Sequence, residues 1–284
     1  MGRTPEKLIF GLLLLTLVGC VTPAKQTEAL LKERQNLPSV ALVEHVPFVN
    51  QTAGYCGPAT LTMALQWAGK PAEQKDIAKQ VYTPGAQGSL QTDLISASRR
   101  QGMMAIPIQG LSPLLTEISA GHPVIVFENL ALPWFPQWHY AIVFGYDLNQ
   151  QTVTMHSGPE QNKHWDMSKF ERSWMLGDYW GLVVLPPGQL SATGSELSHV
   201  TAAAALEQIG KTEEARISYL SILKKWPHSL AALIGLGNIS FAKGDYAASV
   251  EYLRQATKAH PESAEAKHNQ AIAEAAANLK KKIH

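Results

Sequence analysis

The sequence predicts an α+β domain followed by an all-α domain of helical repeats. Two observations carry this prediction. In the middle of the chain, helical patterns are followed by consecutive strand patterns separated by turns, which is typical of an α+β fold. Toward the end of the chain, glycines and prolines recur at a period of 34 residues, as Gly210 and Gly244 do. A length of 284 residues is sufficient for both domains.

The composition excludes several classes of protein. Lys and Arg total 24 and Asp and Glu total 23, so the net charge is +1 and no basic stripe is available to bind nucleic acid. A hydrophobic fraction of 45% argues against a disordered chain. The chain has a single long apolar run, so it is not a polytopic membrane protein. We therefore expect a folded protein that does not bind nucleic acid.

Residues 1–19 are predicted to be a lipoprotein signal peptide. Arg3 and Lys7 precede the apolar run Leu8–Val18. This run is shorter than the roughly 20 residues that a bilayer-spanning helix needs, but it suits the core of a signal peptide. It ends in Leu-Val-Gly-Cys at Cys20, which resembles the bacterial lipobox and implies lipidation, including palmitate, on Cys20. The alternative is a plain signal or anchor helix with an incidental cysteine.

Lipidation of Cys20 would place the protein in the cell envelope. By resemblance to the sorting rules of Gram-negative bacteria, Val21 after the cysteine implies the outer membrane, facing the periplasm. We expect residues 20–43 to be a tether with a short helix around Ala29–Arg34. Cys56 is then the one free thiol of the exported chain, which is a chemical liability unless it is buried or used.

Cys56 is predicted to open a helix. Gly57 and Pro58 break the chain there, and an apolar pattern of period 3.6 follows. The positive end of a helix dipole favours a thiolate, so we expect a depressed pKa for Cys56. Gln51 lies five residues earlier, where its amide and the Cys56 N–H could bind an oxyanion. The alternative is a small buried cysteine at a helix start.

The other elements of this domain are predicted from their periodicity and their caps. We expect a short strand at 46–49 and helices at 71–81, 89–100 and 112–120, the last with Ser112 as N-cap and Pro113 in the first helical position. His139 opens the second of the strands that follow, and Ser168 opens a capping box. The predicted strands are 124–127, 138–146, 152–155 and 179–185.

Two blocks of sequence resemble a known family. Gln51-x₄-Cys56-Gly-Pro-Ala-Thr, followed by His139-Tyr-Ala-Ile-Val, resembles the bacteriocin-processing (double-glycine leader) peptidase-like family of cysteine peptidases, and in particular its lipoproteins with C-terminal tetratricopeptide repeats. The resemblance covers roughly residues 44–186. It implies a papain-like fold, a peptide or protein substrate, Cys56 as nucleophile, His139 as general base and Gln51 as oxyanion donor.

The sequence departs from this family at the third catalytic position. Many relatives have an Asp about sixteen residues after the histidine, but here that strand ends without an acid, and His156 lies nearest to the position. A neutral imidazole or a hydroxyl can orient His139 but stabilises imidazolium less than a carboxylate does. Asp147 lies eight residues along the strand, about 26 Å away at ~3.3 Å per residue, and is rejected.

Other chemistry in this region has weaker support. Cys56, His139 and His156 could together bind Zn²⁺, but they lack the short ligand spacings of a zinc site. We expect no metal and no cofactor. The aromatic stretch 133–138 precedes His139 and is either a buried loop or a cleft wall that packs substrate side chains.

The end of the chain resembles tetratricopeptide repeats. After a polar linker at 187–195, Pro227 and Pro261 keep the same 34-residue spacing as Gly210 and Gly244. We expect residues 196–284 to form two repeats and a capping helix, with a concave face for a protein partner. The alternative is a structural brace on the first domain.

Together these patterns predict a lipid-anchored cysteine peptidase whose repeats provide protein–protein contact. The alternative is a catalytically degenerate peptidase fold that binds peptide segments as a scaffold. The missing acid after His139 is the sequence feature that favours the alternative.

Overall fold

The computed structural model describes residues 22–33, 37–51 and 54–283. The predicted signal peptide and Cys20 therefore lie outside the described residues. Among the helices that are described, none combines the length and the apolar character needed to cross a membrane.

Strands from distant parts of the chain form one sheet, in which all neighbouring strands are antiparallel. Its order is β4-β9-β5-β6-β7-β8, and β1 pairs with β6. A separate two-stranded hairpin, β2 (Tyr82–Thr83) and β3 (Gly88–Ser89), lies near α2. The strands of the large sheet are β1 (Val40–Leu42), β4 (Met104–Gln109), β5 (Val124–Asn129), β6 (Trp138–Asp147), β7 (Thr152–Ser157), β8 (Glu160–Asp166) and β9 (Trp180–Leu185).

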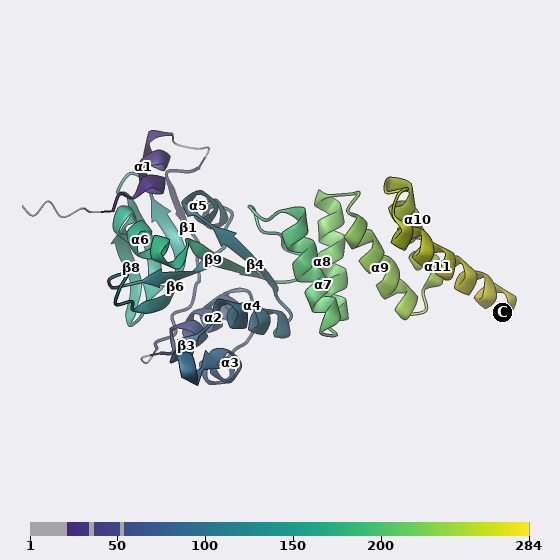
Figure 1. Cartoon of the computed structure of the whole chain (residues 1–284), viewed down its shortest axis with the longest axis horizontal. Coiled ribbons are helices and arrows are strands. Elements are labelled where there is room, and N and C mark those ends of the chain that lie inside the picture. Colours follow the sequence, from purple (N-terminus) through teal and green to yellow (C-terminus); the bar gives the residue numbers. More distant parts are fainter. Residues whose placement is uncertain (1–21, 34–36, 52–53, 284) are drawn as a thin grey trace, which may run out of the picture.

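Helices cover both faces of this sheet (Figure 1). Because side chains alternate along a strand, Ile125 and Ile142 face the cluster that includes α2, whereas Val126 and Val143 face the cluster that includes α5 and α6. Each face of the sheet thus packs against helices in a separate apolar core. The helices of this domain are α1 (Lys25–Lys32), α2 (Cys56–Trp67), α3 (Gln74–Val81), α4 (Gln91–Arg100), α5 (Leu111–Ser119) and α6 (Met167–Trp174).

Five further helices follow one another in a row to one side of the sheet (Figure 1). They pack as antiparallel neighbours, and Ala202, Ala203 and Leu206 of the first helix belong to the same apolar cluster as β4. The prediction of an α+β domain followed by an all-α region is confirmed. These helices are α7 (Glu196–Gln208), α8 (Thr212–Lys225), α9 (Leu230–Ala242), α10 (Tyr246–Ala259) and α11 (Ala264–Ile283).

The segment predicted to be a tether is folded in part. Residues 25–42 contain α1 and β1, and Thr27 and Leu30 of α1 are buried. The buried carboxylate of Glu171 on α6 accepts the backbone N–H groups of Gln26 and Thr27, at 2.9 and 2.6 Å. These are donors that the first turn of a helix leaves unpaired, so Glu171 caps α1 and holds it on the domain.

Several local expectations were wrong. Residues 46–49 do not form a strand: Val46, Phe48 and Val49 pack against the α2 cluster without a neighbouring strand. Helix α5 begins at Leu111, after Gly110 with φ 99°, so neither Ser112 nor Pro113 has the expected position. The N-cap of α6 is Asp166, which accepts the Lys169 N–H, and not Ser168.

A buried carboxylate joins the linker to the first domain. Glu117 on α5 is fully buried and accepts hydrogen bonds from the side chains of Ser191 and Thr193 and from the backbone N–H groups of Ala192 and Thr193. It also contacts Nδ1 of His122 at 2.8 Å. Burial by itself would raise the pKa of Glu117, but these donors outweigh burial and hold the pKa at about 2.

This linkage predicts a pH-dependent stability. The pKa of Glu117 is lowered on folding from 4.5 to about 2, so its contribution is complete above pH 4.5 and is lost as the pH falls toward 2. We expect Glu117→Gln to lower the free energy of unfolding at pH 7 by up to about 3 kcal/mol, and by progressively less below pH 4.5. Denaturant unfolding at several pH values measures this difference.

The exposed carboxylate of Glu73 provides the control. Glu73→Gln is expected to change the free energy of unfolding by less than about 0.5 kcal/mol at every pH. An equal loss of stability for Glu117→Gln at pH 7 and at pH 3 would contradict the account, because the charge would then be irrelevant.

Candidate active site

The N-terminus of α2 is pressed against the β2–β3 hairpin. A Cβ on Gly57 would lie 2.5 Å from Oγ and 2.6 Å from Cβ of Ser89, so only glycine permits this approach. The hydroxyl of Tyr140 on β6 donates to the carbonyl oxygen of Ser89 at 3.1 Å. The hairpin thus holds the first turn of α2 beside the beginning of β6, and Cys56 is the first residue of that turn.

Cys56, His139 and Gln51 line one cavity of about 710 Å³. The structure therefore brings together three of the residues that the sequence analysis selected. The aromatic stretch contributes Pro136, Gln137 and Trp138 to the wall, whereas Trp134 and Phe135 are each 78% exposed. The other lining residues are Gly54, Ala86, Gln87, Gly88, Ser89, Leu90, Phe127, Tyr140, Gly158 and Pro159.

The thiol of Cys56 is protonated in this environment. Burial raises the pKa of Cys56, and the backbone N–H groups of Tyr140, Gly57 and Cys56 only partly oppose that effect. The expectation of a depressed pKa was therefore wrong for this state of the molecule. The positive end of α2 is present, but it carries only about half a charge, and the loss of solvation outweighs it.

His139 is also neutral. Burial, together with a smaller contribution from the positive charge of Lys163, lowers the pKa of His139 to about 4. A hydrogen bond of 3.1 Å joins Nε2 of His139 and Oγ of Ser157, which leaves Nδ1 as the ring nitrogen without a hydrogen bond among the described residues. The site therefore holds a thiol and an imidazole, and not a preformed ion pair.

His156 is not joined to His139. The Asn162 N–H donates to Nδ1 of His156, and Nε2 lies 3.2 Å from the carbonyl oxygen of Val46. The reason is register: His156 pairs with Ile142 and shares its face of the sheet, whereas His139 is three residues from Ile142 and points to the other face. Ser157, one residue further, contacts His139. Ser157 could not be predicted from the sequence, because only the register of the strands brings it to His139.

Gln51 contributes an amide to the cavity. Its Nε2 lies 3.5 Å from the position that a Cβ on Gly158 would occupy, and its Oε1 is buried without a hydrogen-bond partner among the described residues. The amide and the backbone N–H of Cys56 are the groups that could bind an oxyanion at this site.

The described residues include no group of three or more His, Cys, Asp or Glu side chains arranged to hold a metal ion. In particular, both ring nitrogens of His156 contact backbone groups, so His156 does not complete a ligand set with Cys56 and His139.

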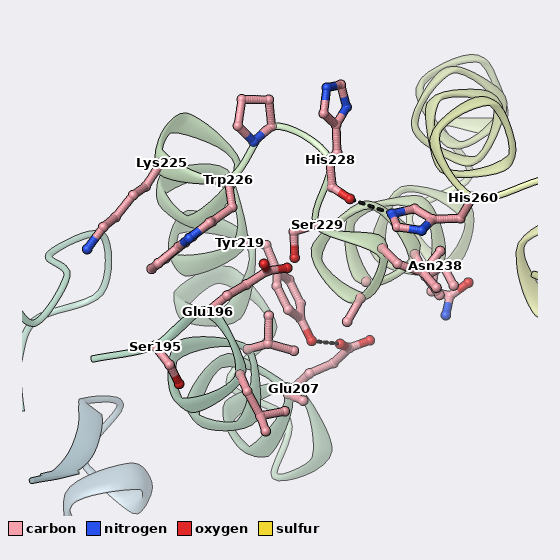
Figure 2. A pocket seen from close by; sticks show the side chains of 18 of the residues that line it. Ser195, Glu196, Glu207, Tyr219, Lys225, Trp226, His228, Ser229, Asn238 and His260 are labelled. Atoms are coloured by element: carbon pink, nitrogen blue, oxygen red, sulfur yellow. Dashed lines mark hydrogen bonds between the residues drawn. The ribbon is translucent and has the colours of Figure 1, made fainter. Parts of the chain in front are cut away.

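A second and larger cavity, of about 1010 Å³, lies among the repeat helices (Figure 2). Tyr219 lines this cavity and donates to Glu207 at 2.9 Å, and Nε2 of His260 lies 2.6 Å from the carbonyl oxygen of His228. Lys225 lies over the ring of Trp226. The cavity contains no thiol, so we assign the chemistry to the smaller cavity around Cys56.

Comparison with known families assigns the sheet domain and the following helices to two different families. The sequence model of the Peptidase C39-like family matches residues 43–177, and a tetratricopeptide-repeat model matches residues 200–264 and 234–281. The chain therefore combines a Peptidase C39-like domain with tetratricopeptide repeats. No curated protein matches the chain.

Three solved structures are similar at 18% identity, a level that concerns the fold alone. The match to a C39-like peptidase from Bacillus anthracis covers 54% of this chain and 100% of that protein, with a TM-score of 0.46. The peptidase domain of Streptococcus ComA, a bifunctional ABC transporter, is 99% covered by 50% of this chain, with a TM-score of 0.42. A double-glycine-motif protease of an AMS/PCAT transporter, in complex with the leader peptide, is 93% covered by 51% of this chain, with a TM-score of 0.39.

The contact between His139 and Ser157 predicts the effect of adding an acid. Ser157→Asp places a carboxylate beside Nε2, which should raise the pKa of His139 by about 1–3 units and so favour the thiolate–imidazolium pair. We expect Cys56 to react with iodoacetamide at pH 7 about tenfold faster than in the wild type. Ser157→Asn, of the same size without charge, is the control, and equal rates for the two variants would contradict the account.

Proposed function

We propose that the protein is a lipid-anchored cysteine peptidase that hydrolyses peptide bonds with Cys56 as nucleophile and His139 as general base. The observation that carries the proposal is the one cavity that Cys56, His139 and Gln51 line together. A nucleophile, a base and an oxyanion donor in one cleft are the minimum set for acyl transfer to a thiol.

The chemistry follows from this arrangement. Sγ of Cys56 attacks the carbonyl carbon of the scissile bond while its proton passes to Nδ1 of His139. The carbonyl oxygen becomes an oxyanion, which the Cys56 N–H and the Gln51 amide bind. Collapse of this intermediate breaks the C–N bond, and the leaving amine takes the proton from His139. Water, deprotonated by His139, then hydrolyses the thioester and restores the thiol.

Because Cys56 and His139 are both neutral before substrate binds, the thiolate forms only during the reaction. Because burial raises the pKa of Cys56 and lowers the pKa of His139, the proton transfer accompanies attack on a bound substrate and does not precede it. Ser157 keeps Nδ1 available by holding Nε2. Such a site protects its thiol between turnovers, which suits an oxidising compartment.

The proposal extends to the membrane anchor and to the repeats. Lipidation of Cys20 would anchor the protein to the outer membrane, facing the periplasm. The cavity in the repeats, with Trp226 and Leu230 on its wall and Glu207 and Asn238 as polar partners, suits a protein segment that presents apolar side chains (Figure 2). The repeats would thus bring a protein partner to the peptidase domain.

A second function is a peptide-binding scaffold without catalysis. Two observations favour it: Ser157 stands beside His139 in place of an acid, and the thiol is protonated. The scaffold would use the same cleft and the same aromatic wall, so peptide binding alone does not separate the two functions, whereas hydrolysis does.

The peptidase proposal predicts the effect of three substitutions on cleavage of a pool of synthetic peptides, read by mass spectrometry. Cys56→Ala and His139→Ala should abolish cleavage, because the nucleophile or its base is lost. Gln51→Ala should lower turnover by about 10²–10³, the usual cost of one oxyanion donor, and should leave the alkylation of Cys56 by iodoacetamide unchanged.

Exposed Trp134 lies outside the lining of the cavity, so Trp134→Ala is expected to retain hydrolysis and to serve as the control for handling and purity. Cleavage by Cys56→Ala at the wild-type rate would exclude the thiol mechanism. Peptide binding without any cleavage by the wild type would leave the scaffold as the function.

The anchor predicts a separate result. Cys20→Ala should abolish incorporation of labelled palmitate and should move the protein from the membrane fraction to the soluble fraction, because the lipid is attached through this thiol. Incorporation at the wild-type level in Cys20→Ala would contradict the anchor while leaving the peptidase proposal intact.

A further inference from the structure

Glu128 lies directly opposite His139 in the sheet. The two residues are Cα partners in the antiparallel pairing of β5 with β6, in a stretch without a bulge. Partners of this kind project their side chains from the same face, with Cβ atoms about 4.5–5.5 Å apart. The side chains of Glu128 and His139 therefore leave the same face of the sheet side by side, although the two residues are eleven positions apart in the sequence.

Glu128 is a buried acid, and none of its contacts among the described residues requires a negative charge. It has no exposed surface, and Oε1 has no hydrogen-bond partner among the described residues. Oε2 accepts a single hydrogen bond, from Oγ of Ser173 on α6, at 2.8 Å. A neutral glutamine could accept that bond equally well, so the hydrogen bond does not explain a carboxyl at this place.

The ammonium group of Lys163 affects the pKa of both Glu128 and His139. Lys163 on β8 lowers the pKa of His139 and also the pKa of Glu128, and its own ammonium is paired with Glu160 at 2.8 Å. Burial nevertheless raises the pKa of Glu128 to about 7, so the carboxyl changes its charge near neutral pH. Glu128 thus ionises in the range in which a hydrolase of this kind would work.

We propose that Glu128 is the acidic positioning residue of the active site. It lies on β5, before His139, and supplies the negative charge that β7, after His139, lacks. This inference rests on the proposed function, because it assigns Glu128 a role through His139. When the proton of Cys56 passes to Nδ1 of His139, the imidazolium gains a carboxylate neighbour, and the ion pair becomes more populated than with a neutral neighbour. Ser157 orients the ring and Glu128 stabilises its charge.

The test is the pH–rate profile of Cys56 alkylation by iodoacetamide, measured on the full chain. Glu128→Gln should react about ten- to a hundredfold more slowly than the wild type at pH 8, which corresponds to one to two pKa units of His139. The two profiles should converge at pH 5, because there the wild-type carboxyl is protonated and as neutral as glutamine. Glu128→Asp, which keeps the charge, should recover most of the rate.

A matched control removes a different buried carboxylate. Glu171, which caps α1, is also fully buried and accepts the N–H groups of Gln26 and Thr27. Glu171→Gln should leave the alkylation profile of Cys56 unchanged. A second readout is thermal unfolding: because burial raises the pKa of Glu128 above that of the unfolded chain, wild-type stability falls between pH 4.5 and 7, so Glu128→Gln should melt higher than the wild type at pH 8.

The outcomes separate this inference from the proposed function. Slower alkylation in His139→Ala together with a wild-type profile in Glu128→Gln would overturn the role of Glu128 and leave the Cys56–His139 pair standing. A wild-type profile in His139→Ala would overturn the proposed function itself. Equal slowing of Glu128→Gln at pH 5 and pH 8 would mean a structural effect and would also overturn the inference.

Discussion

The contact between the first turn of α2 and the beginning of β6 determines the rest of the active site. It exists because Gly57 lets the β2–β3 hairpin approach and because the Tyr140 hydroxyl holds that hairpin through the carbonyl of Ser89. Cys56 opens the helix and His139 nearly opens the strand, so a single packing contact between two secondary-structure elements sets the relation of nucleophile and base. The sheet then supplies Ser157 and Glu128 through its register, without further loops.

The same packing explains the neutral state of the pair. Bringing the helix end onto the sheet removes water from the thiol and the imidazole, and desolvation disfavours both charged forms. An acid close to the histidine compensates for part of that cost only while it is itself ionised. Glu128 therefore links reactivity to pH, whereas Glu117, which many donors keep ionised, contributes stability and ties the linker before the repeats to the first domain.

Much of this architecture follows from local patterns in the sequence. Cys56 is marked by a helix start, His139 by a strand start and Gln51 by its position five residues before Cys56, and the repeats are marked by their period. The residues that were missed depend on strand pairing. Ser157 and His156 differ only in which face of β7 they occupy, and Glu128 becomes a neighbour of His139 through the pairing of β5 with β6. Strands β4 and β8 also escaped prediction, because β4 contains Pro107 and is an edge strand, and β8 is largely polar and exposed.

The central claim is that Cys56 and His139 form a neutral pair before substrate binds. The most direct measurement is the ultraviolet absorbance of the thiolate as a function of pH, in a chain whose other cysteine, Cys20, has been replaced. The account predicts that thiolate appears only above the ordinary thiol pKa of 9.0, because burial raises the pKa of Cys56. A thiolate already present at neutral pH and lost on His139→Ala would contradict it, since the resting site would then be an ion pair.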